Sequence, residues 1–365
     1  MQKLLSPRTD FDADLKKYGL KIFGLLQAGV WKVDLYKNGK HVIDTKCTWP
    51  AVWGGKAIGV RGEFLVPKDA PLGYTADSIF QGFYIDSAKK WCVTQPNSKG
   101  GYSWLEWISI QGNKVYGHDH VVAEDGAAPE DISLEGMFSD YDNFVIIGRT
   151  PTTEYKHVWK RLSYDWVPEA EQYEVVDSII PPPSDRKDWQ ADRKKFGLRI
   201  FGLLWGGIWN MKFFKGDKEM LDTNCSWPLV WGTWLCGTIG ESLIPEDQNM
   251  QYEGDSLNMA FYMSDEDCWC SPAAYANGGY SILKYTSMDG DKIAAIEAVQ
   301  TAEGAPVVYD LYDCNIPDYD HFDYHITSLH GSARIVGKRV SYVTATPASK
   351  IAYKGKNVIA YKGKK

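Results

Sequence analysis

The sequence predicts an all-β protein built from two tandem up-and-down antiparallel β-barrels, each with about ten strands and a short N-terminal helix. The first observation behind this prediction is an internal duplication. Segment 16–20 returns as 194–198 and segment 160–164 returns as 338–342, both at an offset of 178 (194 − 16 and 338 − 160). Because no net insertion or deletion separates the copies, both are expected to share one fold. The second observation is a series of short alternating runs separated by turn residues.

Each copy is expected to open with a short helix. An Asp-rich turn at 10–14 precedes apolar residues at helical spacing, and its acidic side chains suit a helix N-terminus. These apolar residues are Leu15, Tyr18, Ile22, Leu25 and Leu26. The predicted helix runs into Gly29-Val30-Trp31, which returns as Gly207-Ile208-Trp209.

Beyond this segment the pattern changes to the period of a strand. Trp31, Val33 and Leu35 alternate with more polar residues, and Asn38-Gly39 supplies a hairpin turn. Further runs lie at about 41–49, 56–66, 78–85, 90–95, 101–110, 114–123, 131–138, 143–149 and 155–164. Nothing of crossover-helix length separates them, which excludes a parallel sheet. A meander of this length closes most simply into a barrel, which also removes exposed edges.

The duplication also sets the domain boundaries. We place the first barrel at residues 6–167, a Pro-rich linker at 168–183, the second barrel at 184–346 and a Lys-rich tail at 347–365. Three consecutive prolines at 181–183 predict an extended, semi-stiff linker. The tail is expected to be solvated, with an edge hairpin formed by its two similar runs as the alternative.

Charge and cysteine content limit the partners and the compartment. The net charge of −7, from 40 basic and 47 acidic residues, argues against nucleic acid as a partner. No apolar run reaches the length of a signal peptide or a membrane span, so no membrane partner is expected and the protein is predicted to be cytoplasmic. Seven cysteines, an odd number, favour reduced thiols. Cys268 and Cys270 share a strand face, but buried hydrophobes explain them better than a zinc site does.

The Gly29-Val30-Trp31 and Gly207-Ile208-Trp209 segments, followed by the strand pattern of each copy, resemble the calycin superfamily of lipocalins, fatty-acid-binding proteins and nitrobindin-like barrels. The resemblance implies a barrel that holds a ligand, and it implies that Trp31 and Trp209 pack across the barrel floor. It does not imply an activity, because such barrels host both carriers and enzymes. The haem-binding histidine of nitrobindin-like members has no clear counterpart, since no histidine is matched between the copies.

The largest difference between the copies lies on the strand after residue 113. Tyr116, His118 and His120 point to one side of this strand, and the second copy replaces them with apolar residues. The replacements are Ala294, Ile296 and Ala298. If this face lines the core, the two imidazoles are candidate catalytic groups near neutral pH. The alternative is that the face is exposed to solvent in both copies.

Glu106 is the third candidate catalytic residue. It shares a strand face with Tyr102 and Trp104, and its counterpart is Lys284 on the face of Tyr280. A carboxylate on an aromatic wall would have a raised pKa unless it were paired. We therefore predict Tyr102, Trp104, Tyr116, Tyr280 and Lys284 to line substrate-binding cavities.

Three other residues complete the predicted substrate-binding set. Arg61 lies on the same face of a strand as Glu63 and becomes Ile239 in the second copy, so it is expected to hold an anionic group or to form a salt bridge. Asp323 and His325 replace apolar residues of the first copy on one strand face and could form a dyad.

From these observations we expect an enzyme that binds a hydrophobic or aromatic small molecule in a barrel cavity and performs isomerisation, cyclisation or lyase chemistry by acid/base catalysis. No cofactor and no metal are expected, because phosphate-binding Gly loops, metal-ligand spacings and a nucleophile elbow are absent from the sequence. The alternatives are a non-catalytic carrier or sensor of a lipid, pigment or haem, and a scaffold whose barrels pack on each other in cis.

Overall fold

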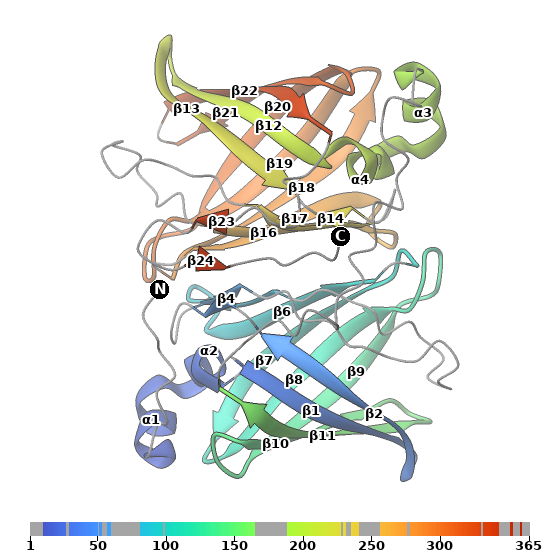
Figure 1. Cartoon of the computed structure of the whole chain (residues 1–365), viewed down its shortest axis with the longest axis vertical. Coiled ribbons are helices and arrows are strands. Elements are labelled where there is room, and N and C mark those ends of the chain that lie inside the picture. The colour runs from blue at the N-terminus through green and yellow to red at the C-terminus, as the bar shows by residue number, and fades with distance from the viewer. Residues whose placement is uncertain are drawn as a thin grey trace. The chain divides into compact units, whose positions relative to one another are not determined.

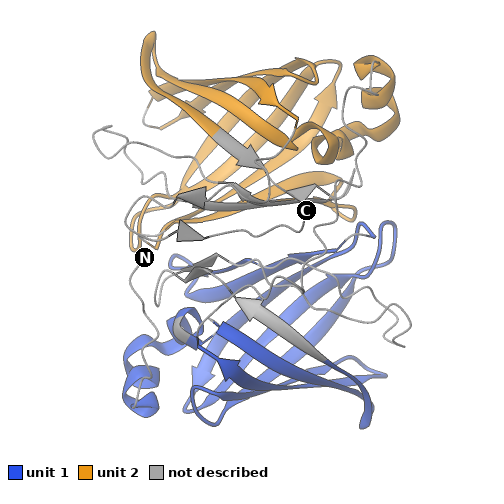
Figure 2. Ribbon diagram, viewed as in Figure 1, with its two compact units in different colours: residues 1–167 blue, residues 168–365 orange. Residues whose placement is uncertain are grey.

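The computed structural model describes residues 10–26, 29–49, 51–52, 57–59, 81–97, 99–164, 188–227, 229–230, 235–240, 256–275, 278–329, 331–342, 351–352 and 358–359. The chain forms two compact units, residues 1–167 and 168–365 (Figure 2). Both are antiparallel β structures with a short helical entry, as the duplication predicts (Figure 1). The predicted linker lies outside the described residues. Within the tail, Ile351–Ala352 (β23) pairs with Val358–Ile359 (β24).

The helical entry of each unit begins at an aspartate cap. Asp10 accepts a hydrogen bond of 3.0 Å from the backbone N–H of Ala13, and Asp188 accepts one of 2.9 Å from Ala191. Such caps satisfy donors that a first helical turn leaves unpaired. The first unit contains α1 (Phe11–Tyr18), a 3-10 turn (Gly19–Ile22) and α2 (Phe23–Leu26). The second contains α3 (Trp189–Phe196), a 3-10 turn (Gly197–Ile200) and α4 (Phe201–Leu204).

In the described part of the chain, an 11-stranded antiparallel sheet makes up the first barrel, in the order β2-β1-β11-β10-β9-β8-β7-β6-β5-β4-β3. Its strands are β1 (Gly29–Lys37), β2 (Lys40–Trp49), β3 (Ala51–Val52), β4 (Ala57–Gly59), β5 (Gln81–Ile85), β6 (Lys90–Pro96), β7 (Tyr102–Gln111), β8 (Lys114–Val122), β9 (Glu130–Phe138), β10 (Asn143–Arg149) and β11 (Glu154–Ser163). Neighbours in the sheet are neighbours in sequence except where β1 pairs with β11. That pairing joins the two ends of the meander, so the predicted up-and-down barrel is confirmed.

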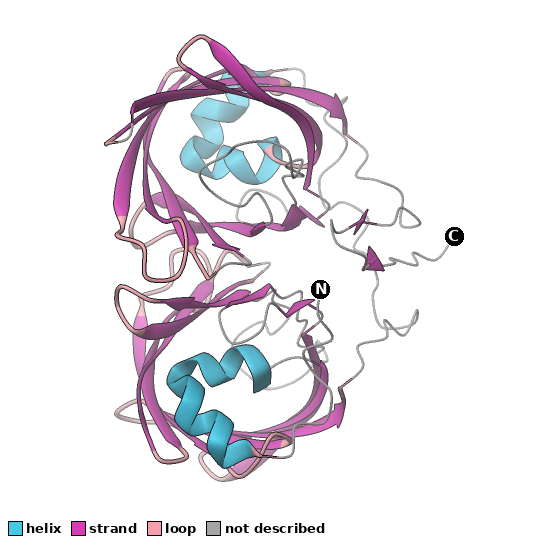
Figure 3. Ribbon diagram, turned by 90° about the vertical axis from the view of Figure 1, so that its left-hand side faces the viewer, coloured by secondary structure: helices cyan, strands magenta, loops and turns pink. Residues whose placement is uncertain are grey.

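Among its described residues the second barrel repeats this order with 11 strands, β13-β12-β22-β21-β20-β19-β18-β17-β16-β15-β14. Its strands are β12 (Gly207–Lys215), β13 (Lys218–Trp227), β14 (Leu229–Val230), β15 (Leu235–Gly240), β16 (Ser256–Met263), β17 (Cys268–Tyr275), β18 (Tyr280–Asp289), β19 (Lys292–Gln300), β20 (Val308–Asp318), β21 (His321–Ser328) and β22 (Gly331–Ser341). Figure 3 shows each sheet curving around a central interior, with the helices of the same unit across one end of the barrel.

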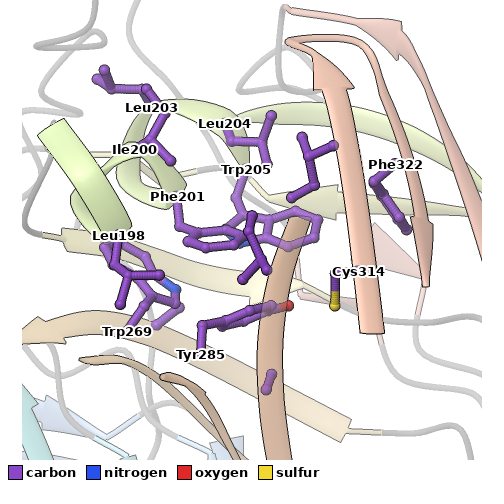
Figure 4. Packing of buried hydrophobic residues seen from close by; sticks show 14 of the residues in the cluster. Leu198, Ile200, Phe201, Leu203, Leu204, Trp205, Trp269, Tyr285, Cys314 and Phe322 are labelled. Carbon is purple, nitrogen blue, oxygen red and sulfur yellow. The ribbon is translucent and has the colours of Figure 1, made fainter. Parts of the chain in front are cut away.

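Aromatic packing beneath the helices fills that end of each barrel. In the first barrel the Phe23 ring stacks on Trp107 at 5.5 Å and on Trp91 at 6.0 Å, and all three are fully buried. In the second, the centre of the Phe201 ring lies 4.1 Å from that of Tyr285 and 5.9 Å from that of Trp205. Figure 4 shows these three side chains in the packed cluster. Rings of this size dominate the energetics of a core, so each unit has a hydrophobic centre of its own.

A buried arginine ties the helical entry to the last strand in each unit. The Arg161 guanidinium lies 4.1 Å from the centre of the Trp31 ring and donates hydrogen bonds to the carbonyls of Leu26 (2.5 Å) and Tyr141 (2.8 Å). Arg339 repeats this arrangement over Trp209 at 4.2 Å. Both tryptophans are buried, which confirms the structural role predicted for them.

Gly29 makes the close approach of the last strand feasible. Its φ is +99°, and a Cβ at this position would lie 2.3 Å from the carbonyl oxygen of Ser163. A larger residue would therefore meet both backbone strain and a clash. Gly207 has the same φ range and the same clash with Ser341.

Candidate functional site

The alternation of side chains decides which residues of each strand face the barrel interior. Trp91 on β6 lies opposite Trp107 on β7, which lies opposite Gly117 on β8. Trp91 and Trp107 belong to the aromatic core. Because successive side chains point to opposite faces of a sheet, the neighbours Glu106 and His118 point outward.

The predicted inward orientation of His118 and His120 is therefore wrong. Both lie on the outer face, where the His118 side chain is 45% exposed and its Nε2 lies 3.0 Å from Oε2 of Glu106. His120 Nδ1 lies 2.9 Å from Oδ1 of Asp131. The expected proximity of His118 to Glu106 is present, but it is a surface contact.

The second copy shows the physical reason for this error. Ile296, which occupies the position of His118, also faces outward and is 37% exposed. The apolar residues at this face therefore do not line a core. A difference between the copies is tolerated here because this outer face is exposed to solvent in both copies. A shift of one residue in the assumed alternation transfers every side chain to the other face.

Glu106 and Lys284 each take part in a salt bridge on the outer face. Glu106 Oε2 lies 3.0 Å from Lys90 Nζ, and Lys284 Nζ lies 2.5 Å from Glu266 Oε2. The charge at this position is reversed between the copies, and the charge of the residue that pairs with it is reversed as well. This arrangement is a salt bridge with neighbouring residues, and the predicted cavity wall at Glu106 and Lys284 is wrong.

The other aromatic candidates share this outward alternation. Trp104 lies opposite His120, and Tyr116 lies opposite Glu135 on β9. Tyr102 and Tyr280 are buried at the starts of their strands but alternate with the inward-facing serines that follow them. The prediction that these four side chains line the barrel interior is wrong.

Asp323 and His325 form surface contacts. Two nitrogens of Arg334 donate hydrogen bonds to the Asp323 carboxylate, at 2.8 and 2.6 Å, and lower the pKa of Asp323. The His325 side chain is 62% exposed, with Nε2 3.5 Å from Asp323 Oδ1. The predicted dyad is thus an outer-face ion pair. Arg61 lies outside the described residues.

The first barrel holds a carboxyl group that faces inward and that the sequence reasoning missed. Asp119 on β8 lies opposite Leu105 on β7 and Ile132 on β9. The Ser103 side chain hydrogen-bonds to this carboxyl. Burial raises the pKa of Asp119 to about 7, although the hydrogen bond from Ser103 and the charge of His120 both lower it. Its Oδ1 atom is inaccessible to solvent and has no hydrogen-bond partner among the described residues.

Half-buried apolar side chains lie opposite this carboxyl on both neighbouring strands, Leu105 on β7 and Ile132 on β9. Both pack against the core but are partly exposed, whereas Trp107 and Val115 at the helical end are fully buried. Inward-facing residues that are partly exposed indicate that this half of the barrel is less completely filled than the aromatic end.

His157 on β11 is another inward-facing ionisable residue of the first barrel. It lies opposite Leu35 on one side and Ile146 on the other. Burial lowers the pKa of His157 to about 4, so the ring is neutral at pH 7. The second copy has Ile335 at this position.

Glu297 occupies the position of Asp119 in the second barrel but has different neighbours. The Tyr312 hydroxyl donates a hydrogen bond to Glu297 Oε2, and Ser281 supplies another. Burial raises the pKa of Glu297, and the negative charge of Asp310, its partner across the ladder, raises it further. The second carboxyl is therefore held by hydroxyl donors from its own barrel.

One sequence signal could have located this site. An acidic residue stands at 119 and at 297, and a serine stands at 103 and at 281, all at the offset of 178. The positions that differ most between the copies, such as His118 and Glu106, lie instead on the outer face. Asp44 and Asp222 are also matched acids on strands and yet are exposed, so the better sign is the acid matched together with a serine on the neighbouring strand.

Metal ligation has no support in the described part of the chain. No group of three or more His, Cys, Asp or Glu side chains suited to a metal occurs there. Burial raises the pKa of the Cys268 thiol to about 12 and also raises that of Cys270, so both are protonated thiols. Among the described residues no helix is both long and apolar enough to cross a membrane.

Comparisons with known proteins identify no family. No family model matches the chain, and no curated protein matches it. Among solved structures, a Trp-176-Ala mutant of transferrin binding protein B from Haemophilus parasuis aligns with TM-score 0.19 and 11% identity over 86% of this chain and 75% of that one. Transferrin binding protein B from Neisseria meningitidis aligns with TM-score 0.18 and 9% identity over 86% and 77%. Similarity at this level supports no assignment of function.

Proposed function

We propose that this protein binds a small hydrophobic molecule inside its barrels and acts as a carrier. The observation that carries the proposal is the division of the first barrel interior. One end is filled by aromatic rings, and the other presents half-buried apolar side chains around the buried Asp119 carboxyl. The resemblance of the Gly29-Val30-Trp31 segment to calycins, whose barrels hold ligands, supports the same proposal.

The energetics favour an apolar ligand with a single polar group. Removal of about 200 Å² of apolar surface from water contributes about 5 kcal/mol at the usual coefficient, before the cost of immobilising the ligand. Leu105, Ile132 and Ile146 offer such surface, and Asp119 can orient the polar end. This division between apolar walls and few polar groups is typical of small-molecule sites.

The proposal can be tested with the neutral dye Nile red, whose fluorescence increases in an apolar environment. We expect saturable enhancement by the wild-type protein and a loss of at least tenfold in affinity for Ile132→Trp, which puts a bulky ring in place of the partly exposed side chain opposite Asp119. His118→Ala removes a side chain from the outer face and is the matched control. No enhancement, or equal affinity for both variants and the wild type, would contradict a binding site inside the first barrel.

Acid/base catalysis in the first barrel is a second candidate function. It is favoured by the Asp119 pKa of about 7, because a general acid or base is most efficient when its pKa is near the working pH. Neutral His157 faces the same interior. In this version Asp119 replaces the outward-facing His118 as the acid/base in isomerisation, cyclisation or lyase chemistry.

The two candidates differ in what the protein retains. Native mass spectrometry of protein purified from its source should detect the bound molecule. A carrier releases the compound unchanged. An enzyme incubated with the compound converts it into a different molecule. In that case Asp119→Asn abolishes the conversion, while Nile red still binds.

A reducing, cytoplasmic location completes the proposal. The described cysteines Cys268, Cys270 and Cys314 are free and buried, which is the state favoured by a reducing compartment.

A further inference from the structure

The two barrels differ in whether a tyrosine hydroxyl of the same barrel donates a hydrogen bond to the inward carboxyl group. In the second, the Tyr312 hydroxyl donates to Glu297. The position of Tyr312 is held by Leu134 in the first barrel, at the offset of 178, and leucine has no hydrogen to donate. Asp119 consequently keeps Oδ1 buried and without a partner among the described residues, while its contact with Ser103 remains.

We propose that the first barrel selects a hydrophobic amine, whose ammonium group donates a hydrogen bond to Oδ1 of Asp119 while its hydrocarbon part packs against Leu105 and Ile132. The second barrel does not select this ligand, because Tyr312 already occupies its carboxyl. The inference rests on the proposed binding function and adds the chemical class of the ligand.

A buried, unpaired carboxylate oxygen is costly, and the cost disappears when a ligand supplies the missing donor. An ammonium group supplies a charge-assisted hydrogen bond, which is stronger than a neutral one. His157 does not oppose the cation, because its lowered pKa keeps the ring neutral. The apolar neighbours on β7 and β9 give the bound ion pair a weakly screening environment.

Amine binding should increase in strength as the pH rises through about 7. The cation favours the ionised form of Asp119, so binding must displace a proton at lower pH. The groups that act on the Asp119 carboxyl are Ser103 on β7, which hydrogen-bonds to it, and His120 on β8 itself, whose charge favours the ionised form. His157 on β11 faces the same interior and is neutral at this pH. A neutral ligand that accepted a hydrogen bond from protonated Asp119 would show the opposite dependence.

The experiment is isothermal titration calorimetry of the full chain with 2-phenylethylamine, using uncharged 2-phenylethanol as the counterpart. At pH 8 we expect one site per chain and an affinity for the amine at least tenfold above that for the alcohol. Asp119→Asn should remove this preference. A preference below threefold, or one kept by Asp119→Asn, would overturn the inference.

The duplication offers an exchange of side chains as a stricter test. Leu134→Tyr gives the first barrel the hydroxyl of the second and should lower amine affinity at least tenfold. Tyr312→Leu frees the Glu297 carboxyl and should raise the stoichiometry from one to two. An unchanged affinity in the first variant and an unchanged stoichiometry in the second would both count against the proposal.

Nile red separates failure of the inference from failure of the proposed function. Wild-type protein that binds the dye but shows no preference for the amine refutes only the ligand class. Protein that binds neither compound refutes the binding function as well. Circular dichroism of each variant establishes that it is folded before titration, and Asp119→Asn decides the question if Leu134→Tyr does not fold.

Discussion

At the scale of single residues, the buried groups separate into those that stabilise the fold and those that are available to a ligand. Arg161 belongs to the first group, because its hydrogen-bonding nitrogens are satisfied by backbone carbonyls and by Asp142. Asp119 belongs to the second, because an acceptor oxygen is left without a partner among the described residues. Satisfied buried groups stabilise a structure, whereas unsatisfied ones point to function or strain.

Arg161→Ala should reduce the free energy of unfolding of the first barrel by roughly 3–5 kcal/mol, as expected for breaking a buried charged network. The variant leaves the carbonyls of Leu26 and Tyr141 without their donor. Urea denaturation monitored by tryptophan fluorescence measures the change. Arg149→Ala is the control, since that side chain is 48% exposed and should change stability by less than about 1 kcal/mol.

Asp119 should make the first barrel less stable as the pH rises from about 4 to about 7. Its pKa is raised from 3.8 to about 7 in the folded protein, so over this interval the folded state binds more protons than the unfolded state. The total effect is at most about 4 kcal/mol. Melting temperatures of the wild type and Asp119→Asn across this range measure it.

The variant should lose most of this pH dependence and gain relative stability at pH 8. Asp131→Asn is the matched control, because that side chain is 81% exposed and should leave the profile unchanged. Parallel profiles for the wild type and Asp119→Asn would show that Asp119 does not titrate near neutrality.

At the scale of elements, the first strand and the last strand of each unit complete the barrel. Residues Val30 to Lys37 of β1 pair with β11, and the same pairing joins β12 to β22. The glycine at the start of β1 and β12 is required by this closure, since a side chain there would meet the backbone of the last strand.

Gly29→Ala should destabilise the first barrel by about 2–4 kcal/mol, because the added Cβ meets Ser163 and the backbone adopts a positive φ. Gly39→Ala is the control for backbone strain alone, since its φ is +76° but no atom lies within 4 Å of the added Cβ. It should cost about 1 kcal/mol. Thermal denaturation of both variants tests the difference, and equal losses would show that close packing at Gly29 is unimportant.

At the scale of the whole molecule, one folding plan is used twice with different interiors. Each core is assembled from residues of its own unit. The buried acid is retained in both copies, while Leu134 becomes Tyr312 and His157 becomes Ile335. Duplication has therefore preserved the architecture and changed the chemistry of the inward face.

Trp209→Ala should destabilise the second barrel by roughly 3–5 kcal/mol, since it empties a fully buried aromatic site. The first barrel should retain its stability, because Trp209 contributes nothing to its core. Hydrogen exchange followed by mass spectrometry resolves the units, with Trp31→Ala as the reciprocal variant. Equal loss of protection in both units would contradict independent cores.

The sequence by itself determined the duplication, the all-β class, the helical entry and the antiparallel meander. These features follow from local patterns, namely the offset of 178, the alternation around Trp31 and the turn at Asn38-Gly39. They were predictable because each depends on neighbouring residues or on the comparison of one copy with the other.

Only the tertiary structure decided which face of each strand is inside. The alternation places His118 and Asp119 on opposite faces, but the pattern of mixed polar and aromatic residues on β8 does not mark the inner one. The packing of Trp107 and Val115 beneath the helices sets it, through contacts between strands and helices that are distant in sequence. That choice moves the candidate site from His118 to Asp119, because a side chain on the inner face loses water and can gain a ligand.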